Sequence, residues 1–192
     1  MRTNTRSGLR ARATNADTFY TLFATPIGEC GIAWNVRGIC AVQLPESAAA
    51  VTRARLQRRQ PRAQSAAPPP PIRRAMSAIV RLLKGESREL GPLAIDYGGA
   101  SEFHRRVCEA ARAIPAGQTL TYGELAARLG QPGAARAVGG VMARNALPII
   151  VPCHRVLAAG GRPGGFSAHG GVTTKLRMLR IEGAIRADDL RM

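Results

Sequence analysis

The chain has 192 residues, with 28 lysines and arginines against 12 aspartates and glutamates, and its formal net charge is +16. This length predicts one domain, or two small domains that share a core. The apolar fraction of 45% is that of a globular protein. Because no apolar run approaches the roughly 18 residues that a membrane helix needs, we do not expect an integral membrane protein.

Cysteine usage and the N-terminal sequence predict the compartment. The four cysteines, at positions 30, 40, 108 and 153, show no paired short spacing, which argues against a zinc ribbon and against a dense disulfide framework. Residues 1–15 contain no apolar core, so no signal peptide is expected. We therefore expect reduced thiols and a cytoplasmic protein, associated with the nucleoid if the source is bacterial.

The positive charge indicates the kind of partner. An isoelectric point near 11.5 favours a polyanion, with DNA or RNA as the first choice and a membrane surface as the second. The alternative is that the enrichment in arginine and alanine only reflects GC-rich coding. Aromatic residues make up 4% of the chain, which argues against a stacking platform for single strands.

The first elements in chain order are a basic arm, a set of strands and a helix. Residues 1–18 carry four arginines with little to bury and predict a disordered arm. Residues 19–44 consist of short apolar runs and predict two or three strands, with turns at 26–28 and 36–38. Residues 48–60 predict a helix, and a solvated face is one interpretation of its arginines at 53, 55, 58 and 59.

A proline-rich segment over residues 61–71 predicts an extended, exposed connector. The apolar spacing over residues 72–83 predicts a helix, and residues 90–97 predict a short strand. We interpret residues 19–97 as an N-terminal α/β domain with a scaffolding role, and residues 98–192 as a second domain.

The second domain is predicted to be rich in helices. One helix is expected from Ser101 until Pro115 stops it. Thr121 is the expected N-cap of a helix over 122–129, and a four-residue turn joins it to another helix over 134–142. Two short helices across such a turn predict a helix-turn-helix at about 121–143. A tightly packed interior helical hairpin is the alternative.

Residues 147–156, LPIIVPCHRV, combine an apolar run with three functional side chains. The run predicts a strand that ends at Pro152, and Cys153, His154 and Arg155 follow it. An imidazole that takes the proton of a thiol, directly or through water, turns the sulfur into a nucleophile. Neighbours in an extended strand point to opposite faces, so the two side chains can cooperate only if the chain turns there. The alternative is an inert buried cysteine.

Several blocks of the second half, taken in order, resemble one family. The blocks are IPAGQTLTYGELA, RAVGGVMARN, PCHRV, GGF and KLRMLRIEG. Together they resemble the O6-alkylguanine-DNA alkyltransferases (methylated-DNA–protein-cysteine methyltransferases) almost continuously over residues 103–183, and more weakly over 20–44 and 85–97. The expected fold is a two-part α/β protein, with a small N-terminal mixed β-sheet domain with helix and a helical C-terminal domain that carries the helix-turn-helix.

The resemblance implies an enzyme that repairs DNA by direct damage reversal. The implied reaction is an irreversible, stoichiometric transfer of the alkyl group, typically methyl, from O6-alkylguanine in duplex DNA to the enzyme's own cysteine. Alkylation at O4 of thymine is a second substrate that the resemblance leaves open. Cys153 falls on the acceptor cysteine, and His154 on the histidine that deprotonates it through a water. Glu182 falls on the carboxylate that orients this imidazole, and Tyr122 on the tyrosine whose hydroxyl supports the departure of guanine.

For DNA binding, the resemblance implies that the target nucleotide rotates out of the helix. Arg136 matches the arginine that holds the vacated space, Met142 an apolar contact to the flipped base, and Asn145 the hinge before the active-site loop. Arg155 is expected to brace this loop. The remaining implied substrate or DNA contacts are Ala135 beside Arg136, and Val156, Phe166 and Ser167 in the loop over residues 152–171.

Some residues depart from the family pattern. Cys108 stands where an aromatic residue is common, Phe166 stands where tyrosine is frequent, and the loop around His169 is slightly longer than in some relatives. We expect no metal site, no organic cofactor, double-stranded DNA with alkylated guanine as the partner, no membrane contact, and a monomer. The rival functions are a module that binds lesions without transfer and a thiol hydrolase with many turnovers.

Overall fold

The first half of the chain forms a sheet, as predicted. The structure is a computed structural model that describes residues 17–185, so almost all of the expected basic arm lies outside the described residues. Strands β1 (Phe19–Thr25), β2 (Gly28–Asn35) and β3 (Gly38–Gln43) form an antiparallel meander. The short strand β4 (Gln64–Ser65) pairs in parallel with β1, which gives the strand order β3-β2-β1-β4.

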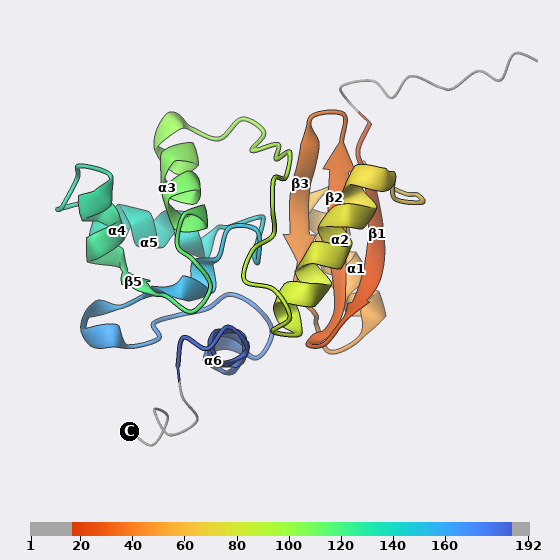
Figure 1. The fold of residues 1–192 in the computed structure, drawn as a ribbon. Coiled ribbons are helices and arrows are strands. Elements are labelled where there is room, and N and C mark those ends of the chain that lie inside the picture. The colour runs from red at the N-terminus through yellow and green to blue at the C-terminus, as the bar shows by residue number, and fades with distance from the viewer. Residues whose placement is uncertain (1–16, 186–192) are drawn as a thin grey trace, which may run out of the picture.

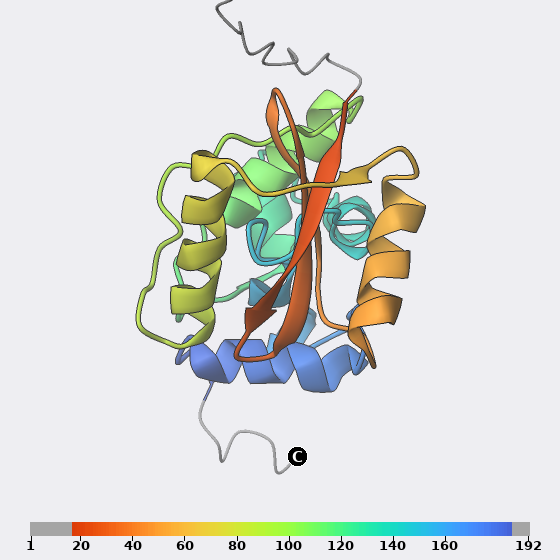
Figure 2. The ribbon, with the colours of Figure 1, turned by 90° about the vertical axis from the view of Figure 1, so that its right-hand side faces the viewer.

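Two helices flank the sheet (Figures 1 and 2). Helix α1 (Ala49–Arg59) buries Leu56 in a small cluster with Tyr20, Ala33 and Ala41. Helix α2 (Pro70–Leu83) begins with prolines, whose missing N–H costs nothing in the first turn, and it buries six residues. Since successive side chains of a strand point to opposite faces, the same strands that face α1 also contribute Ile32 and Val42 to the main core.

The second half is helical. It contains α3 (Glu102–Arg112), α4 (Tyr122–Arg128), α5 (Ala135–Ala143) and α6 (Gly171–Ile181). Strands β5 (Leu120–Thr121) and β6 (Val156–Leu157) form a small parallel pair, and 3-10 turns cover Cys153–Arg155 and Ala159–Gly161. Figure 1 places α4 and α5 beside α3, at the end of the molecule away from β1 and α2. The predicted pair of short helices across a turn is therefore present.

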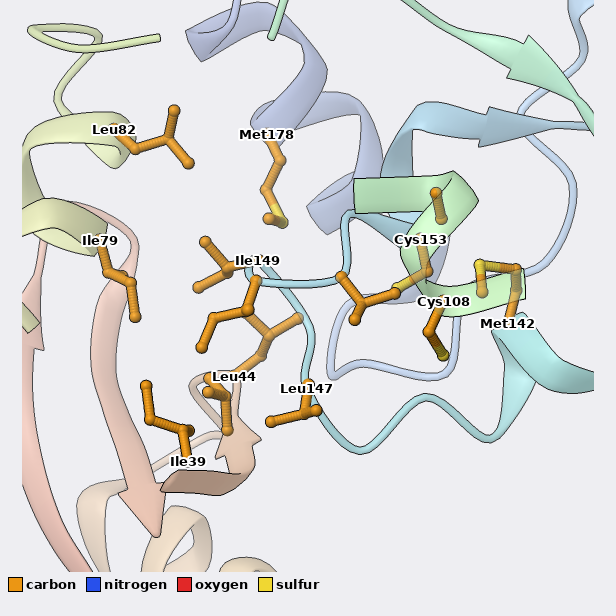
Figure 3. Packing of buried hydrophobic residues seen from close by; sticks show 14 of the residues in the cluster. Ile39, Leu44, Ile79, Leu82, Cys108, Met142, Leu147, Ile149, Cys153 and Met178 are labelled. Atoms are coloured by element: carbon orange, nitrogen blue, oxygen red, sulfur yellow. The ribbon is translucent and has the colours of Figure 1, made fainter. Parts of the chain in front are cut away.

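One continuous cluster of buried hydrophobic residues extends from the sheet into the helical half. Figure 3 shows Ile149 in the middle of this packing, with Ile79 of α2 on one side and Cys153 on the other. A backbone hydrogen bond of 2.8 Å from the Val42 N–H to the Ala146 carbonyl also joins β3 to the segment before Cys153. The sheet therefore holds the segment that carries the reactive residues.

Two predicted strands differ from the structure. The prediction of a strand over residues 147–152 is wrong, because this buried segment is a series of turns in which Ile149 adopts a φ of 74°. Residues 90–97 form only a single bridge, between Ile95 and Ile39. The connector over 61–71 is mostly exposed, but it includes β4, and α2 begins at Pro70 rather than at residue 72. An apolar run in the sequence predicts that a segment is buried, but burial alone does not determine its φ and ψ angles. Residues 147–152 and 90–97 are apolar without being regular strands.

Neither a membrane helix nor a metal cluster is found within residues 17–185. No helix there is long and apolar enough to cross a bilayer. The same residues bring together no group of three histidine, cysteine or acidic side chains that could hold a metal ion.

The β2–β3 turn supplies a stability prediction. Gly38 has a φ of 138°, and a Cβ there would collide with the backbone of Ala94, whose carbonyl accepts a hydrogen bond from the Ile39 N–H. We expect Gly38→Ala to destabilise the protein by roughly 1–3 kcal/mol, which thermal denaturation would detect as a lower Tm. Gly99→Ala is the control, since a Cβ at Gly99 meets nothing within 4 Å. An unchanged Tm for Gly38→Ala would contradict this account of the turn.

Candidate active site

The chain turns at Cys153, as cooperation with His154 requires. The Cys153 N–H donates to the Val151 carbonyl at 2.8 Å, and a 3-10 turn over Cys153–Arg155 follows directly. Both side chains are buried, with 8% of Cys153 and none of His154 exposed. The turn therefore packs thiol and imidazole into the same interior instead of onto opposite faces of a strand.

Asn145 organises the irregular segment before the thiol. Its side-chain amide donates to the Val151 carbonyl at 2.8 Å, and its Oδ1 accepts from the Leu147 N–H at 2.9 Å. These two bonds satisfy backbone groups that a sheet ladder would otherwise have to satisfy. A buried side chain thus holds the loop in a conformation that the backbone alone does not favour.

His154 is paired with Glu182, the carboxylate that the family resemblance implies. His154 Nε2 lies 2.9 Å from Glu182 Oε1, although the two residues are 28 positions apart. Arg155 donates to the same carboxylate, from Nε at 2.8 Å and from Nη2 at 2.7 Å, and its third nitrogen, Nη1, donates to the Ile114 carbonyl. The structure therefore gives Arg155 the bracing contacts expected of it.

These contacts define the protonation state of the imidazole. Burial opposes ionisation of Glu182, but hydrogen bonds from His154 and Arg155 lower its pKa to about 2, so the carboxylate is an acceptor only. His154 Nε2 must then carry the hydrogen and donate it. Burial lowers the pKa of His154 despite Glu182, which keeps the ring neutral. His154 Nδ1 is left as a lone-pair acceptor without a partner among residues 17–185.

The thiol is protonated in this environment. Burial raises the pKa of Cys153, and the effect is partly offset by Asn145 and by the charge of Lys175. A neutral imidazole with a free acceptor nitrogen is the group that could remove the proton.

Lys175 is a site residue that the sequence reasoning missed. It is fully buried on α6, and its Nζ donates to the Val156 carbonyl at 2.6 Å. Burial lowers its pKa to about 8. The signal available in the sequence was its rarity: Lys84 and Lys175 are the two lysines among 28 basic residues. Arginine is wider and is not deprotonated, so a compact amine fits where a guanidinium does not.

Tyr122 lies at the start of α4, next to the thiol. Thr121 and Glu124 form a capping box there, which fixes the first turn. The ring of Tyr122 approaches α5 and the loop closely, since a Cβ at Gly139 or at Gly164 would lie within 4.0 Å of it. Burial raises its pKa, and a thiolate at Cys153 raises it further.

The other predicted substrate residues lie either around Cys153 or at the start of α5. Val156 and Met142 are buried near Cys153, whereas Phe166 is half-buried in a recess that Cys153 also lines. Ser167 is exposed. Ala135 and Arg136 open α5, and within the described residues Arg136 is exposed and makes no hydrogen bond or ion pair. The structure thus keeps Arg136 apart from the buried group, at a surface.

Comparison with known proteins places the chain in a family. The family described as "6-O-methylguanine DNA methyltransferase, DNA binding domain" matches residues 102–184. A Methanothermobacter thermautotrophicus protein named methylated-DNA–protein-cysteine methyltransferase is 35% identical over 158 residues, which cover 82% of this chain and 81% of that protein. The chain belongs to the methylated-DNA–protein-cysteine methyltransferase family. The predicted family resemblance is thereby confirmed.

Further members of the methyltransferase family support the same conclusion. A Salmonella typhimurium methylated-DNA–protein-cysteine methyltransferase is 52% identical over 85 residues, 44% of this chain and 48% of that protein. The crystal structure of Mycobacterium tuberculosis OGT in complex with DNA is 31% identical, with a TM-score of 0.71 over 88% of this chain and 96% of that chain. This similarity confirms the predicted fold class, a mixed α/β protein with a helical part.

Glu182 gives a prediction about acid stability. Its pKa is about 2 when folded and near 4.5 when unperturbed, so its ionised form stabilises the fold above pH 4.5 and this contribution is lost as the pH falls through that window. We expect Glu182→Gln to have a lower Tm at neutral pH and a flatter Tm profile in acid than the wild type. Glu86→Gln is the control, because Glu86 is exposed and its one ion pair within residues 17–185 is with exposed Lys84. Equal acid slopes for Glu182→Gln and wild type would contradict the pairing.

Proposed function

We propose that this protein repairs O6-alkylguanine in double-stranded DNA by transferring the alkyl group to Cys153, irreversibly and once per molecule. O4-alkylthymine is proposed as a second substrate, and the protein is proposed to act as a monomer in the cytoplasm. The observation that carries the proposal is the buried Cys153 beside a neutral His154. The Nε2 of His154 is hydrogen-bonded to Glu182, and its Nδ1 is an acceptor without a partner among the described residues.

The chemistry follows from these groups. The Cys153 proton moves, through a water, to His154 Nδ1, and Glu182 stabilises the resulting imidazolium. Sulfur attacks the sp3 carbon in line, so the S–C bond forms as the bond between that carbon and guanine O6 breaks. Tyr122 donates a hydrogen bond to the guanine ring as negative charge develops on it. In the net reaction the alkyl group moves to sulfur and one proton moves to guanine, and no cofactor is needed.

Access requires base extrusion. The alkylated oxygen of a stacked base cannot reach a buried thiol, so the nucleotide must rotate out of the duplex at a cost of a few kcal/mol. Arg136, exposed near the N-terminus of α5, is proposed to fill the vacated space, and the small side chain of Ala135 allows α5 to approach the groove. Met142, Val156, Phe166 and the loop backbone at Ser167 are proposed to surround the extruded base.

Intact mass tests the acceptor. After incubation with methylated duplex, the wild type should gain the mass of one methylene, mapped to the PCHR peptide, and should gain it once only. Cys153→Ser should gain nothing, whereas Cys40→Ser, which alters a cysteine on β3 outside the site, should gain the same mass as the wild type. A wild type that binds the lesion without a mass change, or that turns over repeatedly, would refute the proposal.

Comparison of two substrates tests Arg136. Arg136→Ala removes the proposed contact to duplex DNA but no contact in the buried site. We expect the rate of transfer from methylated duplex to fall far more than the rate from a free O6-alkylguanine base, both measured under single-turnover conditions. Equal losses on the two substrates would contradict the inserted-arginine role.

A further inference from the structure

The arginines of α1 divide into two pairs. Arg53, Arg58 and Arg59 are all exposed, but Arg53 and Arg58 make no hydrogen bond or ion pair within the described part of the chain. Arg55 and Arg59 lie four positions apart, hence on one face of the helix, and both donate to backbone carbonyls in the second half. A uniformly solvated basic face would not show this difference.

Arg55 joins α1 to the active-site loop. Its Nη1 lies 2.8 Å from Glu46 Oε1, and its Nη2 donates to the Ser167 carbonyl at 2.9 Å. The Glu46 side chain is 7% exposed and also accepts from Gln43 Nε2 at 3.0 Å, so the guanidinium is anchored on the sheet side. A planar guanidinium that bridges two fixed acceptors sets the position of Ser167 relative to β3.

The loop depends on this contact because it has little internal support. Residues 160, 161, 164, 170 and 171 are glycines with positive φ. Within the described residues, the backbone of residues 163–167 makes no hydrogen bond other than the one that Arg55 donates. The segment that is proposed to contact the extruded base is thus held from outside, by the N-terminal half.

Arg59 reaches the other side of the thiol. Its Nη1 donates to the Asn145 carbonyl at 3.3 Å, and Asn145 is the residue that organises the segment before Cys153. Arg59, Arg55 and Cys153 line one narrow recess. Burial and the neighbouring charge of Arg55 lower the pKa of Arg59, whereas Glu46 and a thiolate at Cys153 oppose that effect.

We propose that Arg55 and Arg59 are positioning residues of the alkyl-transfer reaction. Helix α1 then lines the active site, and the N-terminal half contributes directly to the geometry of the reaction. Arg55 fixes the loop that follows the thiol, and Arg59 fixes the hinge that precedes it and places a cation near the sulfur. This inference rests on the proposed function, because it concerns the same thiol.

The cation also predicts a pH effect. Within the described residues, the other charged or titratable groups close to Cys153 are the adjacent His154, Arg55 of α1, Lys175 of α6, Tyr122 of α4 and Cys108 of α3. A nearby cation favours the thiolate, so removal of the Arg59 charge should raise the pKa of Cys153. The rate of transfer in Arg59→Gln should therefore be lower at neutral pH and recover as the pH rises, whereas Arg59→Lys should keep the wild-type profile.

Single-turnover rates on two substrates test the positioning role. We expect Arg55→Ala to lower transfer from methylated duplex and from free O6-benzylguanine by similar factors, roughly tenfold to a hundredfold, since misplacement by about 1 Å has this effect. Arg53→Ala and Arg58→Ala carry the same loss of charge on the same helix and should keep the wild-type rate on the free base. A loss confined to duplex DNA, or a loss shared with the controls, would overturn the proposal.

Hydrogen exchange provides a readout that does not depend on activity. The amides of Ala158 and Gly171, which donate to the Arg162 and Ala168 carbonyls of the loop, should exchange faster in Arg55→Ala than in Arg53→Ala, while the core strands exchange alike in all variants. Unchanged exchange in this loop would overturn the holding role of Arg55. A wild type that accepts no alkyl group would refute the proposed function, and the exchange experiment would still decide whether α1 holds the loop.

Discussion

A single buried carboxylate organises the reactive half of the molecule. Glu182 accepts hydrogen bonds from His154 and twice from Arg155, and its own backbone carbonyl accepts from Arg88 at 3.2 Å. The end of α6, the turn at the thiol, the end of α3 through Ile114 and the segment before α3 all meet there. A buried charge is tolerated only when its partners are complete, and removal of one partner typically costs about 3–5 kcal/mol. Stability and the tautomer of the imidazole therefore depend on the same group.

The sequence predicted the elements better than it predicted the loops. The strands over 19–43 and the helices were predicted because their apolar periodicity and their turn residues agree with one another. Thiol and imidazole were paired on chemical grounds, whereas the partnership of His154 with Glu182 was proposed only from the family resemblance. The segment 147–152 was misjudged, because the side chain of Asn145 and tertiary packing decide its conformation. Lys175, Arg55 and Arg59 were missed, since each of them acts through a hydrogen bond to a backbone carbonyl far along the chain.

The two halves are joined at several levels. Hydrophobic packing is continuous through Ile149, a main-chain bond links Val42 to Ala146, and polar contacts run from α1 to Asn145 and to Ser167. Packing supplies most of the free energy but is not directional, whereas the hydrogen bonds fix where the loop and the hinge stand. A reaction that needs in-line attack depends on the second kind of contact at least as much as on the first.

The left-handed residue in front of the thiol limits how this segment can vary. Ile149 is the one residue other than glycine with positive φ in the described part of the chain, and its side chain is 1% exposed at the junction of the two halves. Left-handed backbone costs a β-branched residue roughly 1–2 kcal/mol. Glycine would remove that cost but would leave a cavity in the core. Asparagine would also tolerate the left-handed backbone, but its buried amide would lack hydrogen-bond partners. The left-handed backbone favours glycine or asparagine at position 149, whereas the buried surroundings favour a large apolar side chain. Few substitutions of Ile149 can therefore be tolerated.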